Sequence, residues 1–337
     1  MTALVVAMDG GQSSTMCLAA DLEGRILGLA RSGPIWHLGE PGGPERVRSA
    51  VADSLAGALR QAGRSGDDVV QAYLSLTGAT GFASEVAREL LPQATITATS
   101  DALGGLASGT YGEPGVAVVA GTGSVAVAVD EQGATRVGGG WGPTLGDQGS
   151  AYGIGLAALR AVAQAADRTG PATVLSTAAL EQLGVEAPRA LFNLVYTREL
   201  DRVGIAALAP LVLRLASGDA VAASIVDEAA DALIRLAVST ADGVDLLDEH
   251  KRVVLTGGLL QGNPGFADRV RAGVRSHLPS YAIVRPAVRP IVGALALALR
   301  ACGLDATAIL TARLATPEWP PDLLAPHPTA SKGHHHD

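Results

Sequence analysis

Cysteine is scarce in this chain, and it has no long apolar run and no run of lysine or arginine. Cys17 and Cys302 lie far apart and match no zinc or C-x-x-C spacing, which favours a reducing, cytoplasmic setting. The most apolar late segment, residues 290–299, is too short to span a bilayer, and no basic segment precedes the first apolar stretch. Because the formal net charge is −8 and basic residues are dispersed, we expect no nucleic-acid or membrane partner.

Small and apolar residues dominate what is present. The 337 residues are 48% hydrophobic and include 42 glycines, a composition typical of an Ala/Gly-rich α/β protein with one large domain or two. The last residues, SKGHHHD, are interpreted as the remnant of an expression tag rather than a metal site, so residues 328–337 are treated as a tail.

The first motif is VVAMDGGQSST at residues 5–15, an apolar run, a turn and a second apolar run. Its glycine pair permits positive φ and close approach of the backbone, and its hydroxyl side chains add donors. The turn therefore has the makings of an anion site, with phosphate the first candidate. A plain hairpin whose glycines only satisfy the turn is the alternative.

The same pattern returns at residues 116–140, VAVVAGTGSVAVAVDEQGATRVGGG. Two copies of one meander indicate two similar lobes, each with a glycine-rich turn, and two such turns suit a polyphosphate. Neither turn is a dinucleotide or P-loop motif, because no helix follows directly and no lysine completes G-x-x-x-x-G-K-[ST].

The remaining pattern predicts alternating helices and strands, with a lobe change near YGEPG at residues 111–115. We expect strands near residues 69–76, 95–98 and 252–255. We expect helices near residues 44–62, 83–91, 150–166, 206–216, 220–242, 265–276 and 291–301.

Two carboxylates lie in segments that indicate a site. TATSDALGGLASGT ends a short strand with Ser100 and Asp101 beside the lobe change, although a single aspartate there is often only a helix N-cap. GGGWGPTLGDQGSAYGIG sets Trp141 among glycines and Asp147 before a helix, an arrangement that suits a polyol whose hydroxyls donate to a carboxylate. The alternative is a structural glycine loop capped by Asp147.

A third segment, RVVLTGGLLQG, places Gly257 and Gly258 directly after a strand. Bare backbone at such a position admits a flat adenine, and a plain strand-to-helix turn explains the glycines equally well.

Together DGGQSST, SDALGGLASGT, AGTGS, GGWGPTLGDQGSAYGIG and LTGGL resemble, in order and spacing, the N-acetylglucosamine kinase-like family of actin-fold sugar kinases. That family belongs to the BadF/BadG/BcrA/BcrD ATPase superfamily, which includes activator ATPases of benzoyl-CoA reductase and 2-hydroxyacyl-CoA dehydratase. The resemblance covers residues 5–300 and implies an α/β fold of two ribonuclease H-like lobes around an ATP and sugar cleft. The first lobe would be residues 1–113, completed by a helix at about 288–312, and the second residues 114–287.

The resemblance also implies roles for individual residues. Asp9 would hold magnesium through water, and Asp101 would be the base that takes the proton of the sugar 6-hydroxyl. The ATP contacts implied are Asp9, Gly10, Gly11, Gln12, Ser13, Gly121, Thr122, Gly123, Gly257 and Gly258. The sugar contacts implied are His37, Thr77, Gly78, Asp101, Ser124, Val125, Trp141, Gly142 and Asp147.

The chain departs from the family pattern at four positions. Gln12 and Ser13 stand where the family has Gly-Thr, and Val125 and Trp36 stand where members acting on N-acetylglucosamine have asparagine. We therefore expect a cytoplasmic, homodimeric, MgATP-dependent kinase of N-acetylglucosamine, glucosamine or another hexose. The alternatives are an activator ATPase, which needs closely placed cysteines for an iron–sulfur cluster, and a non-catalytic regulator that binds sugar and ATP.

Overall fold

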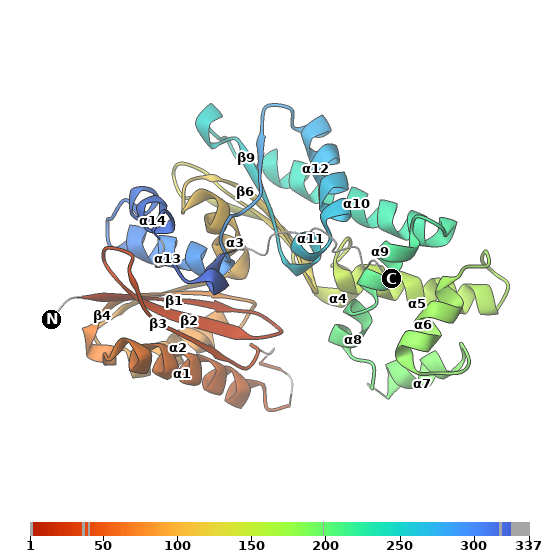
Figure 1. Cartoon of the computed structure of the whole chain (residues 1–337), viewed down its shortest axis with the longest axis horizontal. Coiled ribbons are helices and arrows are strands. Elements are labelled where there is room, and N and C mark those ends of the chain that lie inside the picture. Colours follow the sequence, from red (N-terminus) through yellow and green to blue (C-terminus); the bar gives the residue numbers. More distant parts are fainter. Residues whose placement is uncertain (1–2, 36–37, 40, 198, 317–318, 325–337) are drawn as a thin grey trace, which may run out of the picture. The chain divides into compact units, whose positions relative to one another are not determined.

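A computed structural model describes residues 3–35, 38–39, 41–197, 199–316 and 319–324. They form two compact units (Figure 1). Unit 1 comprises the chain up to residue 117 together with residues 284–324, and unit 2 comprises residues 118–283. Each unit is built on a five-stranded sheet with helices packed against it, which confirms the α/β class.

The sheet of unit 1 has the strand order β3-β2-β1-β4-β5. Its antiparallel part is β1 (Leu4–Gly10), β2 (Thr15–Asp21) and β3 (Ile26–Ser32). β4 (Val69–Leu76) runs parallel to β1, and β5 (Thr95–Ser100) runs parallel to β4. This mixed order is the ribonuclease H-like arrangement that the sequence predicted, and it brings the carboxyl ends of β1, β4 and β5 to one edge.

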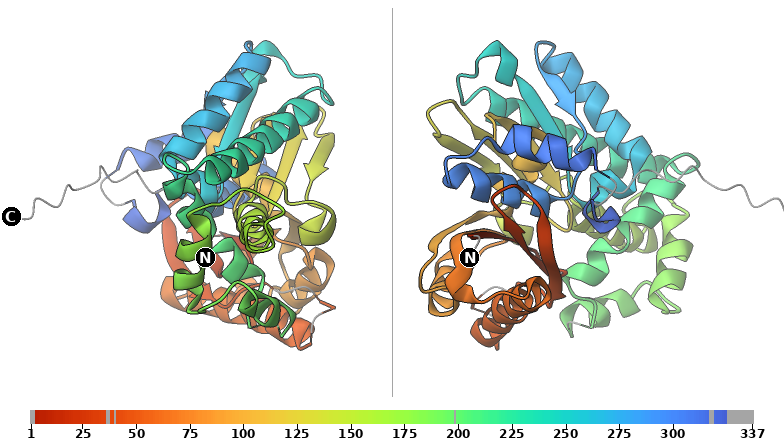
Figure 2. Two further views of the ribbon diagram at one scale, coloured as in Figure 1. Left: turned by 90° about the vertical axis from the view of Figure 1, so that its right-hand side faces the viewer. Right: turned by 60° about the vertical axis from the view of Figure 1, so that its left-hand side comes forward.

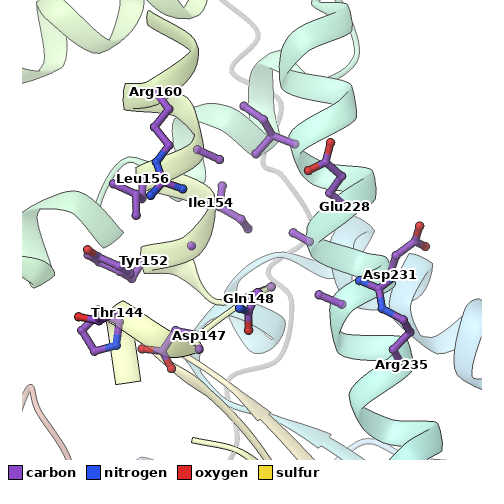
Figure 3. A pocket seen from close by; sticks show the side chains of 18 residues that line it. Thr144, Asp147, Gln148, Tyr152, Ile154, Leu156, Arg160, Glu228, Asp231 and Arg235 are labelled. Carbon is purple, nitrogen blue, oxygen red and sulfur yellow. The ribbon is translucent and has the colours of Figure 1, made fainter. Parts of the chain in front are cut away.

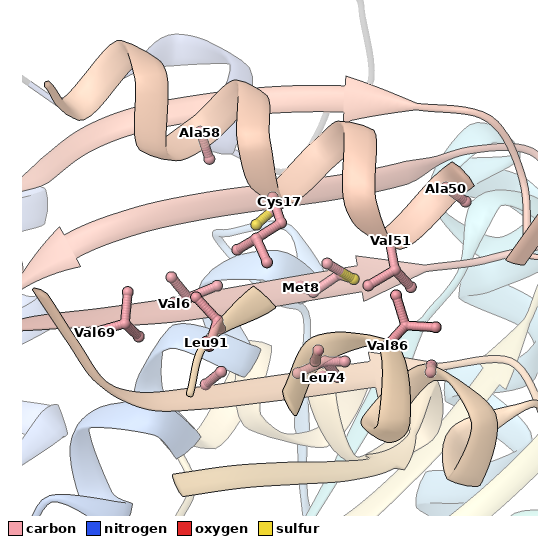
Figure 4. Close-up of a cluster of buried hydrophobic side chains, with 14 of the residues drawn as sticks. Val6, Met8, Cys17, Ala50, Val51, Ala58, Val69, Leu74, Val86 and Leu91 are labelled. Carbon is pink, nitrogen blue, oxygen red and sulfur yellow. The ribbon is translucent and has the colours of Figure 1, made fainter. Parts of the chain in front are cut away.

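Helices cover both faces of this sheet because its strands are apolar on both sides. α1 (Gly43–Ala62) and α2 (Thr80–Leu90) lie on one face, and α3 (Asp101–Thr110), α13 (Pro290–Ala301) and α14 (Ala306–Leu314) lie on the other (Figure 1). Met8 points to the first face, among Cys17, Val51 and Leu74 (Figure 4). Its neighbour Ala7 points to the other face, because successive side chains of a strand alternate.

The crossing of α3 and α13 depends on two glycines. A Cβ on Gly293 would lie 2.1 Å from the carbonyl oxygen of Gly104, so no larger residue fits there. The start of α13 is thereby held beside the start of α3, at the sheet edge where β1 and β4 end.

The sheet of unit 2 repeats the order as β10-β9-β6-β7-β8. Its strands are β6 (Gly115–Ala120), β7 (Ser124–Val129), β8 (Thr135–Gly139), β9 (Arg252–Thr256) and β10 (Ala282–Val284). The helices are α4 (Gly142–Leu145), α5 (Ala151–Ala166), α6 (Leu175–Leu183), α7 (Ala190–Tyr196), α8 (Arg202–Ala206), α9 (Ala209–Leu215), α10 (Ala220–Ala241), α11 (Gly258–Gly262) and α12 (Pro264–His277). Figure 2 shows α10 and α12 side by side.

One helix expected from the sequence is not continuous. Residues 206–216 were expected to be a single helix, but α8 ends at Ala206 and α9 begins at Ala209. Pro210 lies in the first turn of α9, where its missing amide costs nothing, and a helix running into it from α8 would lose a hydrogen bond. The helix expected at about residues 288–312 is likewise divided, since α13 ends at Ala301 and α14 begins at Ala306. The short elements α6, α7 and β10 were not expected.

No single helix among the described residues is long and apolar enough to cross a membrane. The segment of α8 and α9, Arg202–Leu215, and the helix α10, Ala220–Ala241, pass that test together on length and composition, with a bend between them.

Candidate functional site

Three polar residues lie at or just after the carboxyl ends of the parallel strands of unit 1. Asp9 lies opposite Ser75 in the register of β1 and β4, and Leu76 lies opposite Ser100 in that of β4 and β5. Thr77 extends the first pairing, because its amide donates to the carbonyl oxygen of Gly10 at 2.8 Å. The hydroxyl of Thr77 donates to the Oδ2 atom of Asp101. The predicted residues Asp9, Thr77 and Asp101 are thus gathered at one sheet edge.

The structure rejects the interpretation of Asp101 as an N-cap. Ser100 is the N-cap of α3, and its Oγ atom accepts the amide of Ala102 at 3.3 Å. Asp101 is the first residue of the helix and is only partly buried, and its Oδ1 atom accepts the Ser100 hydroxyl at 3.3 Å. Two hydroxyls therefore hold the carboxylate, which keeps lone pairs for another donor because a carboxylate accepts about four hydrogen bonds.

Asp9 lies in an environment that resists its ionisation. Burial and the nearby charge of Asp101 raise its pKa from 3.8 to about 7, and the charge of Arg289 acts in the opposite direction. Two carboxylates at such an edge suit Mg²⁺, which binds through one or two carboxylates together with water and substrate phosphates. Among the residues described, no group of three or more His, Cys, Asp and Glu is placed to bind a metal, so phosphate and water would supply the remaining ligands.

The first turn, residues 10–13, offers unused amides. Gly11 donates to the carbonyl oxygen of Ser14 at 3.0 Å, whereas the amides of Gln12 and Ser13 donate to no group in the described part of the chain. Gly10 fixes the base of the turn, because a Cβ there would lie 2.7 Å from a methyl carbon of Leu76. Adjacent free amides on a glycine turn form a cradle for an anion.

The second turn, residues 121–124, has the same character in unit 2. The amide of Gly121 donates to the carbonyl oxygen of Gly123 at 2.9 Å, and the first residue of α5, Ala151, donates to that of Gly121 at 2.9 Å. The amides of Thr122 and Gly123 have no acceptor among the described groups. A turn anchored in this way presents two donors in a fixed position.

Gly257 and Gly258 lie beside the second turn. Gly257 has φ 102°, and a Cβ there would lie 2.4 Å from the carbonyl oxygen of Ala120, so only glycine fits. A Cβ on Gly121 would lie 3.9 Å from the amide nitrogen of Gly258. The structure therefore brings together, within unit 2, the predicted phosphate turn and the predicted adenosine segment.

Asp147 supports the second turn through its carboxylate. Its Oδ1 atom accepts the amide of Ser124 at 3.1 Å, and its Oδ2 atom accepts a guanidinium nitrogen of Arg202 at 2.6 Å. The side chain of Asp147 is 3% exposed, against 23% for Arg202. Ser150 caps α5, so Asp147 is not the cap of this helix, although its buried, protein-bonded carboxylate agrees with the alternative of a structural loop.

The other predicted sugar contacts of unit 2 lie around the turn and the loop after β8. The hydroxyl of Ser124 is buried and donates to the carbonyl oxygen of Gln148 at 2.9 Å. Val125 pairs with Gly139 in the register of β7 and β8, and a Cβ on Gly140 would lie 3.3 Å from a methyl carbon of Val125. Trp141 is 73% exposed, and Gly142 has φ 76°. His37 and Trp36 lie outside the described residues.

Sequence reasoning missed two arginines that the fold brings to these groups. Arg202 opens α8, far along the chain from Asp147, and Arg289 precedes α13. Neither lies in a recognisable motif, so only the tertiary structure reveals their placement.

A cavity of about 410 Å³ lies within unit 2, along α5 and α10 (Figure 3). Asp147 and Gln148 border it, Arg160 reaches it from α5, and Glu228 and Arg235 reach it from α10. Of the predicted sugar contacts, Asp147 alone is among the residues described as lining it. The cavity therefore does not coincide with the predicted sugar site.

Known proteins that resemble this chain show which family it belongs to. The sequence model of the BadF/BadG/BcrA/BcrD ATPase family matches residues 6–298, which include both glycine turns, Asp101, Asp147 and Gly257. The chain belongs to this family. The match confirms the family predicted from the sequence motifs.

Individual relatives match over nearly their whole length. The chain is 29% identical to an N-acetyl-D-glucosamine kinase of Dictyostelium discoideum over 88% of the chain and 98% of the relative. It is 27% identical to an N-acetylmuramic acid/N-acetylglucosamine kinase of Clostridium acetobutylicum over 88% and 99%. A solved structure of a candidate N-acetylglucosamine kinase from Chromobacterium violaceum has a TM-score of 0.69 at 26% identity, covering 88% of this chain and 99% of that one. These names agree with the predicted class of ATP-dependent hexosamine kinases.

Proposed function

We propose that this protein is an ATP-dependent kinase that phosphorylates the 6-hydroxyl of an amino sugar of the N-acetylglucosamine or glucosamine class. Family membership and the activities named for its relatives support the reaction class. The observation that carries the mechanism is the Asp101 carboxylate, held by two hydroxyls at the strand edge that also bears Asp9.

In the proposed reaction, Asp101 is the general base. It accepts the proton of the 6-hydroxyl while that oxygen forms a bond to the γ-phosphorus and the bond from that phosphorus to the bridging oxygen of ADP breaks. Asp9 would hold magnesium through water, and the bound ion would supply charge neutralisation on the phosphates. The amides of Gln12 and Ser13 in the first turn, and of Thr122 and Gly123 in the second, lack an acceptor among the described groups and are the proposed donors to phosphate oxygens.

The remaining proposed contacts divide by ligand. Gly257 and Gly258 admit the adenosine against bare backbone, next to the second turn. Thr77, Gly78, Ser124, Val125, Trp141, Gly142, Asp147 and His37 are the proposed sugar contacts. Asp147 is proposed to support the sugar site by holding Ser124 and Arg202 in place. Both of its oxygens already accept protein donors, and its side chain is 3% exposed.

The activator alternative is less well supported by the structure. Such a protein needs thiolates near one another at a surface where subunits share a cluster. Cys17 is fully buried in the core beneath α1, and burial raises the pKa of its thiol. The homodimer, the cytoplasmic setting and the bound Mg²⁺ stay predictions.

The test is a screen for sugar-dependent release of ADP. The purified protein with MgATP is offered N-acetylglucosamine, glucosamine, N-acetylmuramic acid, glucose and mannose, with a no-sugar control for each preparation. We expect an amino sugar to stimulate ADP release at least tenfold. A protein that binds ATP and sugar without any stimulated release would be a regulator, and a brown, iron-containing preparation that hydrolyses ATP without sugar would be an activator.

A further inference from the structure

Arg289 occupies a fixed position at the start of α13. Its amide donates to the carbonyl oxygen of Leu323 at 2.9 Å, and the preceding residue, Val288, forms an isolated β-bridge with Leu324. Arg289 is the N-cap residue of α13, with Pro290 as the first residue of the helix. The backbone that carries this guanidinium is therefore anchored to residues 323–324 just before the helix begins.

A chain of contacts places this position beside the carboxylates of unit 1. The carbonyl oxygen of Pro290 lies 3.3 Å from where a Cβ on Gly104 would be, and the amide of Gly104 donates to the Oγ atom of Ser75 at 3.1 Å. Ser75 is the register partner of Asp9. Gly104 is also one helical turn after Asp101, so Arg289 belongs to the edge that bears both carboxylates.

The charge of Arg289 reaches Asp9, yet the guanidinium is not paired. Its positive charge opposes the rise in the pKa of Asp9. Its side chain forms no hydrogen bond or ion pair with any other residue that the structure describes, and its Nε atom is buried without an acceptor. A buried donor that lacks a partner is destabilising, and one that persists in a native protein needs an explanation, such as a catalytic role or a bound ion.

We propose that Arg289 is a further catalytic residue, whose guanidinium contacts the phosphoryl group as it moves from ATP to the sugar. This inference rests on the proposed kinase function. Asp9 and Asp101 both repel an incoming phosphate, and a planar guanidinium offers paired donors that match two phosphate oxygens. Arg289 thus offsets the negative charge of the two carboxylates and of the phosphoryl oxygens.

The step balances without a change in the charge of Arg289. The sugar O6 forms a bond to the γ-phosphorus while the bond from that phosphorus to the bridging oxygen of ADP breaks. The electron pair of the broken bond stays on ADP, and the proton of O6 goes to Asp101. Arg289 donates hydrogen bonds throughout and gives up no proton, because a guanidinium group has donors only and stays protonated in proteins.

The test compares Arg289→Gln, Arg289→Lys and Arg289→Ala with wild type under saturating MgATP and sugar. We expect kcat to fall about 100- to 1,000-fold in the Gln and Ala variants, as for the loss of a cation on a transferring phosphoryl group, with the KM of the sugar changed less than about threefold. Arg289→Lys keeps the positive charge but loses the planar pair of donors, so we expect an intermediate fall in kcat. Guanidinium chloride at millimolar concentration should restore part of the activity of Arg289→Ala. Arg285→Gln, an exposed arginine of the same loop, is the matched control.

Each outcome bears on the proposal. Inactive wild type with every sugar would overturn the proposed function itself, whereas active wild type with an Arg289→Gln variant within about threefold in kcat would overturn only this inference. A purely electrostatic role through Asp9 predicts that Arg289→Gln recovers relative to wild type at pH 9, and such recovery also overturns the proposal. If Arg289→Gln fails to fold, as judged by circular dichroism, Arg289→Lys decides in its place: unchanged kcat overturns the proposal.

Discussion

At the scale of single residues, the carboxylate of Asp101 is the proposed general base, the group on which turnover would depend. Asp101→Asn preserves shape and still accepts one hydroxyl, but it has no basicity for the proton of the sugar. We expect kcat to fall about 10²- to 10⁴-fold, the usual contribution of a general base, with the KM of ATP changed little. Steady-state kinetics of Asp101→Asn beside Asp53→Asn, an exposed aspartate of α1, measures this. Near-normal turnover in Asp101→Asn would remove the proposed base.

Asp9 makes the stability of the ligand-free protein depend on pH. Its pKa is raised from 3.8 to about 7 in the folded state, so the folded state binds this proton more tightly than the unfolded state does. The contribution of Asp9 to the free energy of unfolding is therefore greatest below pH 4 and declines as the pH rises toward 7. Asp9→Asn removes this decline.

The measurement for Asp9 is thermal unfolding of wild type and Asp9→Asn in EDTA at pH 5 and pH 8. We expect the Tm of Asp9→Asn minus that of wild type to be larger at pH 8 than at pH 5, by at least about 2 °C. Asp53→Asn should show no such difference. A gap that does not change with pH would mean that Asp9 ionises as freely in the folded protein as in the unfolded one.

Val125 tests how the sugar is selected. Its side chain carries no donor or acceptor, and an apolar wall discriminates substrates by only about 1–3 kcal/mol. We expect native kcat/KM for N-acetylglucosamine over glucosamine to stay below about a thousandfold, and Val125→Asn to raise that ratio if the acetamido group is near this wall. The control is Val137→Asn, because Val137 lies on the exposed strand β8. Val127 is buried, so Val127→Asn would disturb the core. A native preference above a thousandfold would mean that other residues read the acetamido group.

At the scale of elements, the sequence predicted what local pattern and turn chemistry determine. Strand β4 occupies the expected residues 69–76, because its β-branched and apolar run is bounded by turn residues. The division of residues 206–216 was missed, since the apolar periodicity continues through a break that Pro210 favours. The ion-pair partner of Asp147 and the positive charge near Asp9 were missed for another reason: Arg202 and Arg289 are brought there only by the packing of α8 and α13.

The short helix α8 is predicted to matter because it carries the counter-ion of a buried carboxylate. Arg202→Gln leaves Asp147 buried without its ion pair, which costs about 3 kcal/mol of stability, the lower end for a broken buried pair because Arg202 is 23% exposed. Asp147→Asn in the same chain should recover part of that loss. Chemical denaturation of both single variants and the double variant gives the coupling energy, which we expect to exceed about 1 kcal/mol. Additive losses would show that the pair does not hold the second turn.

At the scale of the whole molecule, the repeated hairpin was the most informative sequence feature. It predicted two similar lobes, and the strand orders β3-β2-β1-β4-β5 and β8-β7-β6-β9-β10 are the same arrangement built twice. Family membership follows from motifs in both units. The sugar itself could not be predicted, because Val125 offers no hydrogen bond that would select one sugar.

The most direct measurement of the central claim is the structure of the product. The protein is incubated with MgATP and N-acetylglucosamine or glucosamine, and the sugar product is examined by phosphorus–proton correlation NMR. The account predicts one ADP formed per phosphorylated sugar and coupling of the new phosphorus to the two protons on C6, with the product formed at least about 100-fold more slowly by Asp101→Asn. ATP consumed without a phosphorylated sugar, or phosphate coupled to the proton on C1, would contradict it.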